Sequence, residues 1–280
     1  MDAQENDGGL IFSQDLSDSL RLDAQHLLWR LHNGYALHPG INKTEHMSIA
    51  DIGTGTGIWL FDLAQELPKT ATLHGYDISV NRYPPRDLWP ENVELDLMDS
   101  LHDPPERLVG KYDVVHMRMW AGTLKTQDVD VLIRNAIKLL RPGGYLQWEE
   151  TNLTDLHIRG QVARDFEHQA SELLASAGFD YSWVFGLSRS LESRGLAVLS
   201  QTLGQFRPGL IHLCTNTHLL ALREIFESIK KKSSPNVALM DACDSGLTNL
   251  ILCHNGELVY NWGPLSLLAQ KSHQVWSKDD

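Results

Sequence analysis

A glycine-rich turn follows the first apolar segment of the chain and reads Asp51-Ile52-Gly53-Thr54-Gly55-Thr56-Gly57. Glycine tolerates positive φ and lets a ligand approach the backbone closely. The apolar residues behind the turn have helical spacing, so the first N–H groups of that helix would face an electron-rich ligand. The G-x-G pattern alone fits a tight strand-to-helix turn equally well, so further residues must decide between the two readings.

An acidic side chain distinguishes this turn from a dinucleotide-binding loop. Asp51 lies two residues before Gly53, and Ile58 stands where the G-x-G-x-x-G fingerprint requires its third glycine. A buried carboxylate is costly unless a cation accompanies it. We therefore expect a ligand with an amine or amino acid end at this turn, rather than a pyrophosphate.

Two more acids follow the next two predicted strands. Asp77 comes 20 residues after Gly57, where an acid in nucleotide-binding α/β folds accepts hydrogen bonds from ribose hydroxyls. Asp99 is placed to accept a hydrogen bond from an adenine amino group, with Ile78 and Met98 packed on the base. Each aspartate by itself is more typical of a turn or helix cap. Three acids around one glycine turn favour a ligand site at the carboxyl edge of a sheet.

Alternating strands and helices must position these residues. Short apolar segments predict strands at residues 46–52, 70–76, 92–97, 111–116, 145–148, 197–203 and 264–269. Helical spacing predicts helices at residues 19–35, 58–67, 129–140, 162–177 and 213–230. The alternation predicts an α/β fold with a doubly wound, mostly parallel, seven-stranded sheet. The last two strands are expected to form an antiparallel hairpin at one edge.

The composition is that of an ordinary globular protein, with 42% apolar and 21% charged residues. Lysine and arginine number 24 against 36 acids, and the net charge of −12 argues against nucleic acid as the main ligand. The polar, acidic start (residues 1–17) predicts no secretory signal, and no segment has the length of a membrane span. The three cysteines show no metal-ligand spacing. We expect a cytoplasmic protein with reduced cysteines, no metal and no membrane contact.

The joint pattern resembles the class I S-adenosylmethionine-dependent methyltransferases. The resemblance rests on the residues at 50–57, 75–77, 98–99, 112–116 and 140–145. It implies the Rossmann-like methyltransferase fold and S-adenosyl-L-methionine as cofactor. The glycine turn would hold the methionine part, Asp77 the ribose and Asp99 the adenine. The expected cofactor-binding residues are Asp51, Gly53, Thr54, Gly55, Gly57, Asp77, Ile78, Met98 and Asp99.

A narrower resemblance spans most of the chain. Residues 21–26, 116–118, 144–150 and 217–222 are similar to those of the fungal secondary-metabolism methyltransferases, a group that includes the velvet-complex global regulator. It implies methyl transfer to an O or N atom of a small molecule, a fungal secondary metabolite or its precursor. We divide the chain into a lead and lid helix (1–40), a cofactor-binding core (41–155), and the remaining sheet with a helical cap over the acceptor site (156–280).

The segment after the fourth predicted strand would face the acceptor. It reads His116-Met117-Arg118-Met119-Trp120 and lacks the Asn/Asp-Pro-Pro-Tyr signature, which disfavours amino groups of bases or glutamine as substrates. His116 is the candidate catalytic base because its ordinary pKa of about 6.5 lies near working pH. Alternatively, His116 ends the strand and positions other groups. Arg118 either contacts an acidic group of the substrate or pairs with Glu149 or Glu150.

Other side chains are candidates for the acceptor pocket or for the core. The candidate aromatic residues are Trp120, Trp148, Tyr181, Trp183 and Phe185, and for any single one a core position is the more common outcome. The helix at 19–35 is expected to cover the site, and its Arg21, Gln25 and His26 face either cofactor or substrate.

Three functions remain open from the sequence. The first is a small-molecule methyltransferase. The second is an S-adenosylmethionine-binding regulator that acts through protein partners. The third, a nicotinamide-dependent oxidoreductase, fits Asp77 but not Asp51 or the missing third glycine. No sequence feature identifies the acceptor or a protein partner.

Overall fold

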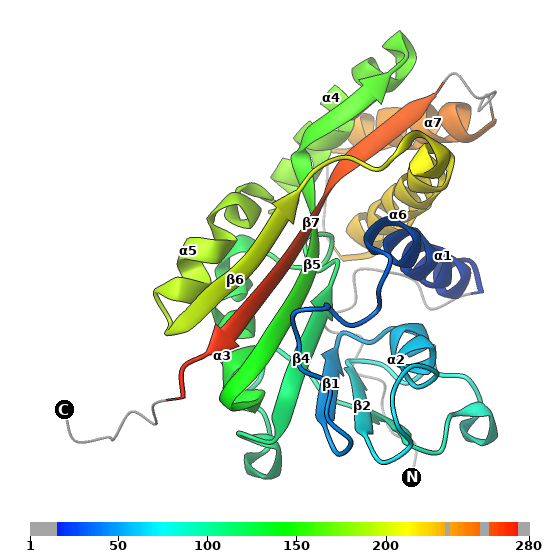
Figure 1. Cartoon of the computed structure of the whole chain (residues 1–280). Helices are drawn as coiled ribbons and strands as arrows, with labels where there is room; N and C mark the ends of the chain where they lie inside the picture. Colours follow the sequence, from blue (N-terminus) through cyan, green and yellow to red (C-terminus); the bar gives the residue numbers. More distant parts are fainter. Residues whose placement is uncertain (1–15, 233–235, 253–257, 274–280) are drawn as a thin grey trace, which may run out of the picture.

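The computed structural model describes residues 16–232, 236–252 and 258–273, and their strands form one seven-stranded sheet (Figure 1). The strands are β1 (Ser48–Ile52), β2 (Thr72–Asp77), β3 (Val93–Leu97), β4 (Tyr112–Arg118), β5 (Leu140–Arg159), β6 (Leu196–Leu203) and β7 (Val259–Lys271). Their order is β3-β2-β1-β4-β5-β7-β6, with β7 antiparallel to both neighbours and the other pairs parallel. The predicted doubly wound, mostly parallel sheet is confirmed.

Helices cover both faces of the sheet. The α-helices are α1 (Leu16–Asn33), α2 (Ile58–Leu63), α3 (Val129–Leu139), α4 (Gln161–Ser176), α5 (Leu187–Glu192), α6 (Ile211–Lys232) and α7 (Val237–Leu252). On one face α3 and α5 bury their apolar residues against β1, β4, β5 and β7, whereas α2 packs on the other face. Since both faces of the central strands are covered, β1 is an almost continuous buried run rather than an alternating one.

The order in which strands are added to the sheet reverses at β1. The chain proceeds from β1 outward to β2 and β3 and then returns to β4 on the other side of β1. In open α/β sheets ligands bind in the crevice at such a switch point, outside the carboxyl ends of the strands. Asp51 and His116 are paired neighbours in register at that edge.

The fifth and seventh strands are much longer than the sequence pattern indicates. The predicted stop at residues 141–144 lies within β5, where the register shifts between Tyr112 and Val114 of β4. The expected strands at 145–148 and 264–269 are only the central parts of β5 and β7, which pair up to Arg159 and Val259. These extensions reach the layer formed by α4, α6 and α7, where Tyr260 is part of the core (Figure 1).

The helices differ from the prediction mainly at their ends. The helix expected at 58–67 ends at Leu63 and continues as turns, and α7 was not predicted. The helices expected at 162–177 and 213–230 correspond closely to α4 and α6. The late strands β6 and β7 do pair in antiparallel fashion at the sheet edge, but α6 and α7 separate them in the sequence. The predicted polar lead up to residue 15 lies outside the described residues, as does Cys253.

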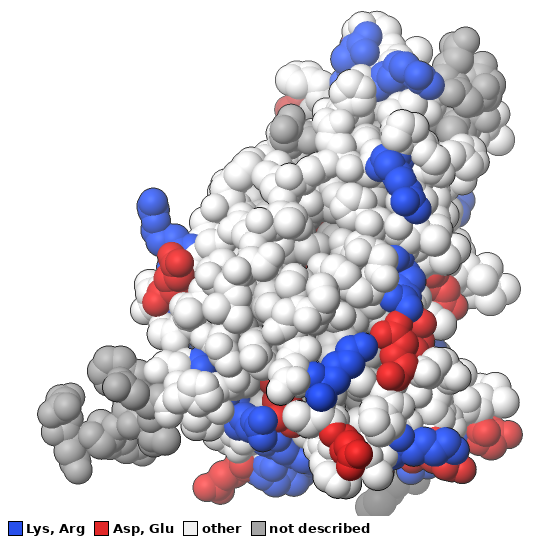
Figure 2. Space-filling view, viewed as in Figure 1, with Lys and Arg blue, Asp and Glu red and all other residues white. Residues whose placement is uncertain are grey.

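Figure 2 shows the face on which β6 and β7 lie in front, with acidic and basic side chains mixed around its lower part. This face has no continuous basic surface, in keeping with the net charge of −12. Among the helices within the described ranges, none is sufficiently long and apolar to cross a lipid bilayer.

Candidate functional site

A cavity of about 790 Å³ opens at the carboxyl edge of the sheet. Residues from the strand ends, from α1 and from the late helices α4 and α6 line it. Six predicted cofactor-binding residues are among them, namely Gly53, Gly55, Asp77, Ile78, Met98 and Asp99. Asp51, Thr54 and His116 instead line a recess of about 60 Å³ that shares Gly53 and Gly55 with the cavity. Gly57 lines neither space.

The glycine turn depends on backbone conformations that favour glycine. Gly53, Gly55 and Gly57 have φ of +73°, +61° and +80°, respectively. A Cβ atom on Gly53 would come within 2.7 Å of the Trp120 ring, and one on Gly55 within 3.1 Å of Leu22 Cδ1. Both the positive φ values and the close side chains therefore exclude larger residues from the floor of the cavity.

Asp77 is buried beside the turn and is already oriented by backbone donors. Gly55 N–H donates to Asp77 Oδ2 at 2.9 Å, and Ser79 N–H donates to Oδ1 at 3.2 Å. Burial raises the pKa of Asp77, although the Arg82 guanidinium, 3.8 Å away, opposes this effect. The carboxylate thus faces the cavity with lone pairs left for hydroxyl donors.

Asp99 caps its own turn as well as lining the cavity. Leu101 N–H donates to Asp99 Oδ1 at 2.9 Å, and His102 Nδ1 lies 2.8 Å from Oδ2. Half-buried Met98 and part-exposed Ile78 line the cavity with it. Asp99 therefore both caps its own turn and lines the cavity, as was expected for a residue that contacts the ligand.

A buried histidine lies between two carboxylates beneath the glycine turn. His116 Nδ1 lies 2.7 Å from Asp51 Oδ1, and its Nε2 lies 3.4 Å from Glu149 Oε2. The imidazole is stacked on the Trp59 indole at a ring-centroid distance of 3.8 Å and is 1% exposed. Thr54 Oγ1 donates to the second Asp51 oxygen at 2.7 Å. Both oxygens of Asp51 thus have a side-chain partner within the protein.

Glu149 joins this histidine to Arg118. Arg118 Nε donates to Glu149 Oε2 at 2.6 Å, and Asn33 Nδ2 donates to Oε1 at 2.9 Å. Burial by itself raises the pKa of Glu149, but Arg118 and His116 outweigh it and lower the pKa to about 2. The predicted pairing of Arg118 with Glu149 is confirmed, and Glu149 is an anion at neutral pH.

The surroundings of His116 favour positioning over catalysis. Both ring nitrogens face carboxylates, and the ring lines the small recess rather than the large cavity. A general base must reach the proton that it removes, directly or through one water. The catalytic role predicted for His116 has no support in this geometry and stays a prediction.

Helix α1 covers the glycine turn. Leu22 packs on Gly55, and Thr56 Oγ1 donates to Asp23 at 2.7 Å. Arg21, which lines the cavity with Gln25, is buried and donates to Glu224 of α6 at 3.0–3.1 Å. The helix is therefore joined both to the turn and to α6.

A second arginine links α1 to the ribose-binding candidate. Arg82 Nε donates to Asp18 of α1 at 2.5 Å, while its guanidinium lies near Asp77. Farther along α1, Arg118 Nη1 lies 3.1 Å from His26 Nδ1, and burial together with Arg118 lowers the pKa of His26 to about 3. His26 is therefore neutral and accepts this hydrogen bond.

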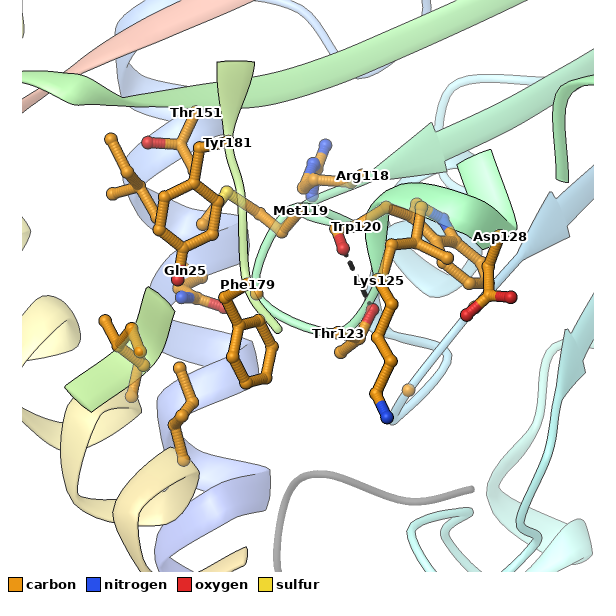
Figure 3. Close-up of a pocket in the computed structure, with 18 of the residues that line it drawn as sticks. Gln25, Arg118, Met119, Trp120, Thr123, Lys125, Asp128, Thr151, Phe179 and Tyr181 are labelled. Atoms are coloured by element: carbon orange, nitrogen blue, oxygen red, sulfur yellow. Dashed lines mark hydrogen bonds between the residues drawn. The ribbon is translucent and has the colours of Figure 1, made fainter. Parts of the chain in front are cut away.

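The cavity has a largely apolar part beyond the cofactor candidates. In Figure 3 the rings of Phe179 and Tyr181 stand across the cavity from Trp120, Lys125 and Asp128. The further apolar lining residues are Leu153, Leu156, Leu174, Leu222, Ile225 and Trp262.

Only two of the five predicted pocket aromatics, Trp120 and Tyr181, line the cavity. Trp148 is 0% exposed and packs on Trp183 in the core, while Phe185 is 59% exposed. Trp148 and Trp183 therefore take the core position that was expected for any single ring, whereas Phe185 lies at the surface. Phe179 and Trp262 were missed because nothing in their spacing places them beside residues of the strand ends.

The loop after β4 is held in a strained form. Met119 has φ +57°, the one positive value for a non-glycine residue within the described ranges. The neighbouring Trp120 and Ala121 donate backbone N–H groups to Glu150 Oε2 at 2.9 and 3.2 Å. Strain of this kind persists where surrounding contacts enforce it, and it is concentrated at functional sites. Here the hydrogen bonds to Glu150 hold the loop in its strained conformation.

Among the described residues, no lysine or arginine pairs with Glu150, in contrast to Glu149. Glu150 is 0% exposed and accepts hydrogen bonds from N–H donors, including Thr151 N–H at 2.9 Å and Trp148 Nε1 at 3.2 Å. Burial raises the pKa of Glu150 to about 7, partly offset by these donors.

Comparison with known families now identifies the chain. A family profile described as a methyltransferase domain matches residues 35–201, which is more than half of the sequence. The chain belongs to this methyltransferase family. The matched residues 35–201 of this chain contain the glycine turn, Asp77, Asp99 and the strained loop after β4.

Three curated fungal proteins are similar to this chain. The methyltransferase grgD of Penicillium sp is 36% identical over 177 residues, covering 57% of this chain and 61% of its own. The N-methyltransferase verN of Clonostachys rogersoniana is 33% identical over 106 residues, covering 38% and 37%. The secondary metabolism regulator laeA of Coprinopsis cinerea is 33% identical over 123 residues, covering 44% and 28%. The match spans less than two thirds of each relative.

We expect the stability of this protein to depend on pH through Glu150. A carboxyl group whose pKa is raised by folding, here from 4.5 to about 7, stabilises the fold fully below the lower value. This contribution is lost as the pH rises through the higher value. The unfolding free energy of the parent, measured by urea denaturation, should therefore fall relative to that of Glu150→Gln by about 3 kcal/mol between these pH values. A pH-independent difference would contradict the assignment.

We expect His116→Ala to destabilise the fold because it leaves Asp51 and Glu149 buried without the ring between them. Leaving a buried acceptor without its hydrogen-bond partner costs about 1–3 kcal/mol, and more when the acceptor is charged. Urea denaturation of His116→Ala should show a loss of this size, whereas His46→Ala, at an exposed position, should change stability by less than about 0.5 kcal/mol. Parent-like stability of His116→Ala would contradict a structural role.

Proposed function

We propose that this protein transfers a methyl group from S-adenosyl-L-methionine to an O or N atom of a small molecule, a fungal secondary metabolite or its precursor. The observation that supports this most directly is that one cavity joins the glycine turn, Asp77 and Asp99 to an apolar, aromatic chamber. A cofactor and an acceptor bound in these two parts would meet at the loop after β4.

The residues at the strand ends fit the parts of this cofactor. Gly53 and Gly55 line the cavity, so a ligand chain beside Trp120 and Leu22 could lie close to their backbone. Asp77 would accept hydrogen bonds from the ribose hydroxyls, and Met98 and Asp99 would flank the adenine. The recess lined by Asp51, Thr54 and His116 would take the amino acid end. When bound, the cofactor supplies a methyl group activated by its positively charged sulfur.

The protein contributes alignment and exclusion of water rather than an identified base. Methyl transfer is an in-line displacement that requires nucleophile, methyl carbon and sulfur to be aligned. Trp120, Phe179 and Tyr181 shape the chamber, and α1 covers its cofactor end. Burial above all, together with the nearby Glu167 charge, raises the pKa of Tyr181, so its phenol stays protonated. The role of His116 in this proposal is to hold Asp51 and Glu149 in place.

A second candidate is a cofactor-binding regulator that acts through protein partners. The similarity to laeA favours it, although the matched part is about a quarter of that protein. Incubation of fungal extract with methyl-labelled cofactor distinguishes the two, because an enzyme labels a small molecule whereas a regulator does not. The nicotinamide-dependent oxidoreductase is no longer proposed, since the chain belongs to a methyltransferase family. The cytoplasmic location stays a prediction from the sequence.

We expect Asp77→Ala to weaken S-adenosylmethionine binding by about ten- to hundredfold. The variant loses two hydrogen bonds to a charged acceptor, which together contribute about 1.5–3 kcal/mol. Isothermal titration calorimetry with S-adenosylmethionine and with NAD measures this, and Asp96→Ala at an exposed position is the matched control. Binding of NAD in place of S-adenosylmethionine by the parent protein would overturn the proposed function.

We expect Gly55→Val to abolish cofactor binding in a folded protein. A branched side chain at φ +61° is strained, and its Cβ would meet Leu22 at the floor of the cavity. Circular dichroism should report native secondary structure while calorimetry detects no binding of S-adenosylmethionine. Gly110→Val, at φ +67° with no neighbour within 4 Å, controls for backbone strain alone. Normal cofactor affinity in Gly55→Val would place the ligand elsewhere.

A further inference from the structure

Two facing polar side chains line the apolar part of the cavity. Glu167 lies on α4 and His218 on α6, and both belong to the cavity wall. Glu167 Oε2 is 3.8 Å from His218 Nε2, too far for a hydrogen bond between them. Their side chains are 14% and 8% exposed, respectively. The two groups are therefore close enough to share one ligand atom.

Both atoms lack a hydrogen-bond partner among the described residues. Glu167 Oε2 and His218 Nε2 are shielded from solvent and are left unsatisfied. An unsatisfied buried polar group costs about 1–3 kcal/mol, and more when it is charged. Native structures seldom leave such groups unexplained, and a ligand donor is one way to satisfy them.

In the part of the chain that the structure describes, no lysine or arginine pairs with Glu167. Within the described ranges, neither a lysine nor an arginine lies within 4.0 Å of this carboxylate, in contrast to Glu149, which has Arg118. The charge of Glu167 acts instead on its tyrosine neighbours: burial first, and then Glu167, raises the pKa of Tyr181 and of Tyr260. Among the described residues, the acidic group thus has phenols and an imidazole as its polar neighbours rather than a lysine or arginine.

The packing holds the histidine in this position. The His218 ring lies 4.7 Å from the Tyr260 ring, tilted by 33°, and Tyr260 OH donates to Ala163 O of α4 at 3.2 Å. Leu174 and Leu222, which line the cavity from the same two helices, make the surroundings apolar. A site with one unpaired acid in apolar surroundings selects a ligand with both an apolar body and a cationic donor.

We propose that Glu167 and His218 form an acceptor subsite that binds the amino nitrogen of an apolar, ring-bearing amine. This inference rests on the proposed function, since it names the class of acceptor for the same cavity. One N–H of the amine donates to Glu167 Oε2 and a second donates to His218 Nε2. The rings of Phe179 and Tyr181 contact the apolar body.

The experiment compares tryptamine with tryptophol, which has a hydroxyl in place of the amine, by calorimetry in the presence of S-adenosylhomocysteine. The parent protein should bind the amine at least tenfold more tightly than the alcohol. In Glu167→Gln this preference should fall below threefold, with the affinity for S-adenosylhomocysteine unchanged. Glu172→Gln, at an exposed position of the same helix, should keep the full preference.

Several outcomes would overturn the subsite. These are equal binding of amine and alcohol by the parent, no amine binding at all, or an unchanged preference in Glu167→Gln. If Glu167→Gln does not fold, Glu167→Asp retains the charge one methylene farther back and should lower the amine affinity alone. Binding of S-adenosylhomocysteine without an amine preference refutes the subsite and leaves the proposed function intact. A preference for the amine in a protein that does not bind S-adenosylhomocysteine refutes the proposed function and leaves the amine-binding subsite intact.

Discussion

The pairing of buried carboxylates with His116 and Arg118 organises the carboxyl edge of this sheet. Asp51 lies near the end of β1, His116 lies on β4 and Glu149 on β5, and each is almost inaccessible to solvent. Placing an isolated carboxylate there would cost several kcal/mol, which only close cations and donors can offset. The three central strands must therefore align so that His116 faces Asp51 on one side and Glu149 on the other. The glycine turn is built on this arrangement, since Thr54 is hydrogen-bonded to the same Asp51 carboxylate.

The same requirement for charge pairing attaches the covering helix. Arg21 of α1 reaches Glu224 of α6, and Asp18 of α1 binds Arg82, whose guanidinium lies near Asp77. Helix α1 is thus connected by buried polar contacts to the late helices and to the ribose-binding candidate. A ligand bound at Asp77 would contact a set of side chains that continues through Arg82 and α1 to α6, and α6 forms part of the wall of the apolar chamber. The cofactor end and the acceptor end of the cavity share one framework of side chains.

The adjacent acids Glu149 and Glu150 of β5 have different structural roles because their side chains lie on opposite faces of the strand. Successive side chains of a strand point to opposite faces, so Glu149 and Glu150 meet different surroundings. Glu149 has Arg118 and His116 beside it and a pKa of about 2, whereas Glu150 accepts from N–H donors and has a pKa of about 7. The first stabilises the charged centre beneath the glycine turn. The second holds the Met119–Ala121 loop in its strained conformation against the cavity.

The sequence by itself determined the alternating α/β order, the glycine turn and the placement of Asp77 and Asp99, because each is a local pattern whose geometry follows from nearby residues. Tertiary structure alone decided which aromatic rings reach the cavity, how far β5 and β7 extend, and what His116 contacts. Arg21 and Glu224 are 203 residues apart, and Glu167 meets His218 only because α4 and α6 pack together. Such pairs leave no periodic signal, since they arise from burial of opposite faces of separate helices. The catalytic reading of His116 depended on its position at a strand end, whereas its contacts were set by the strands on either side.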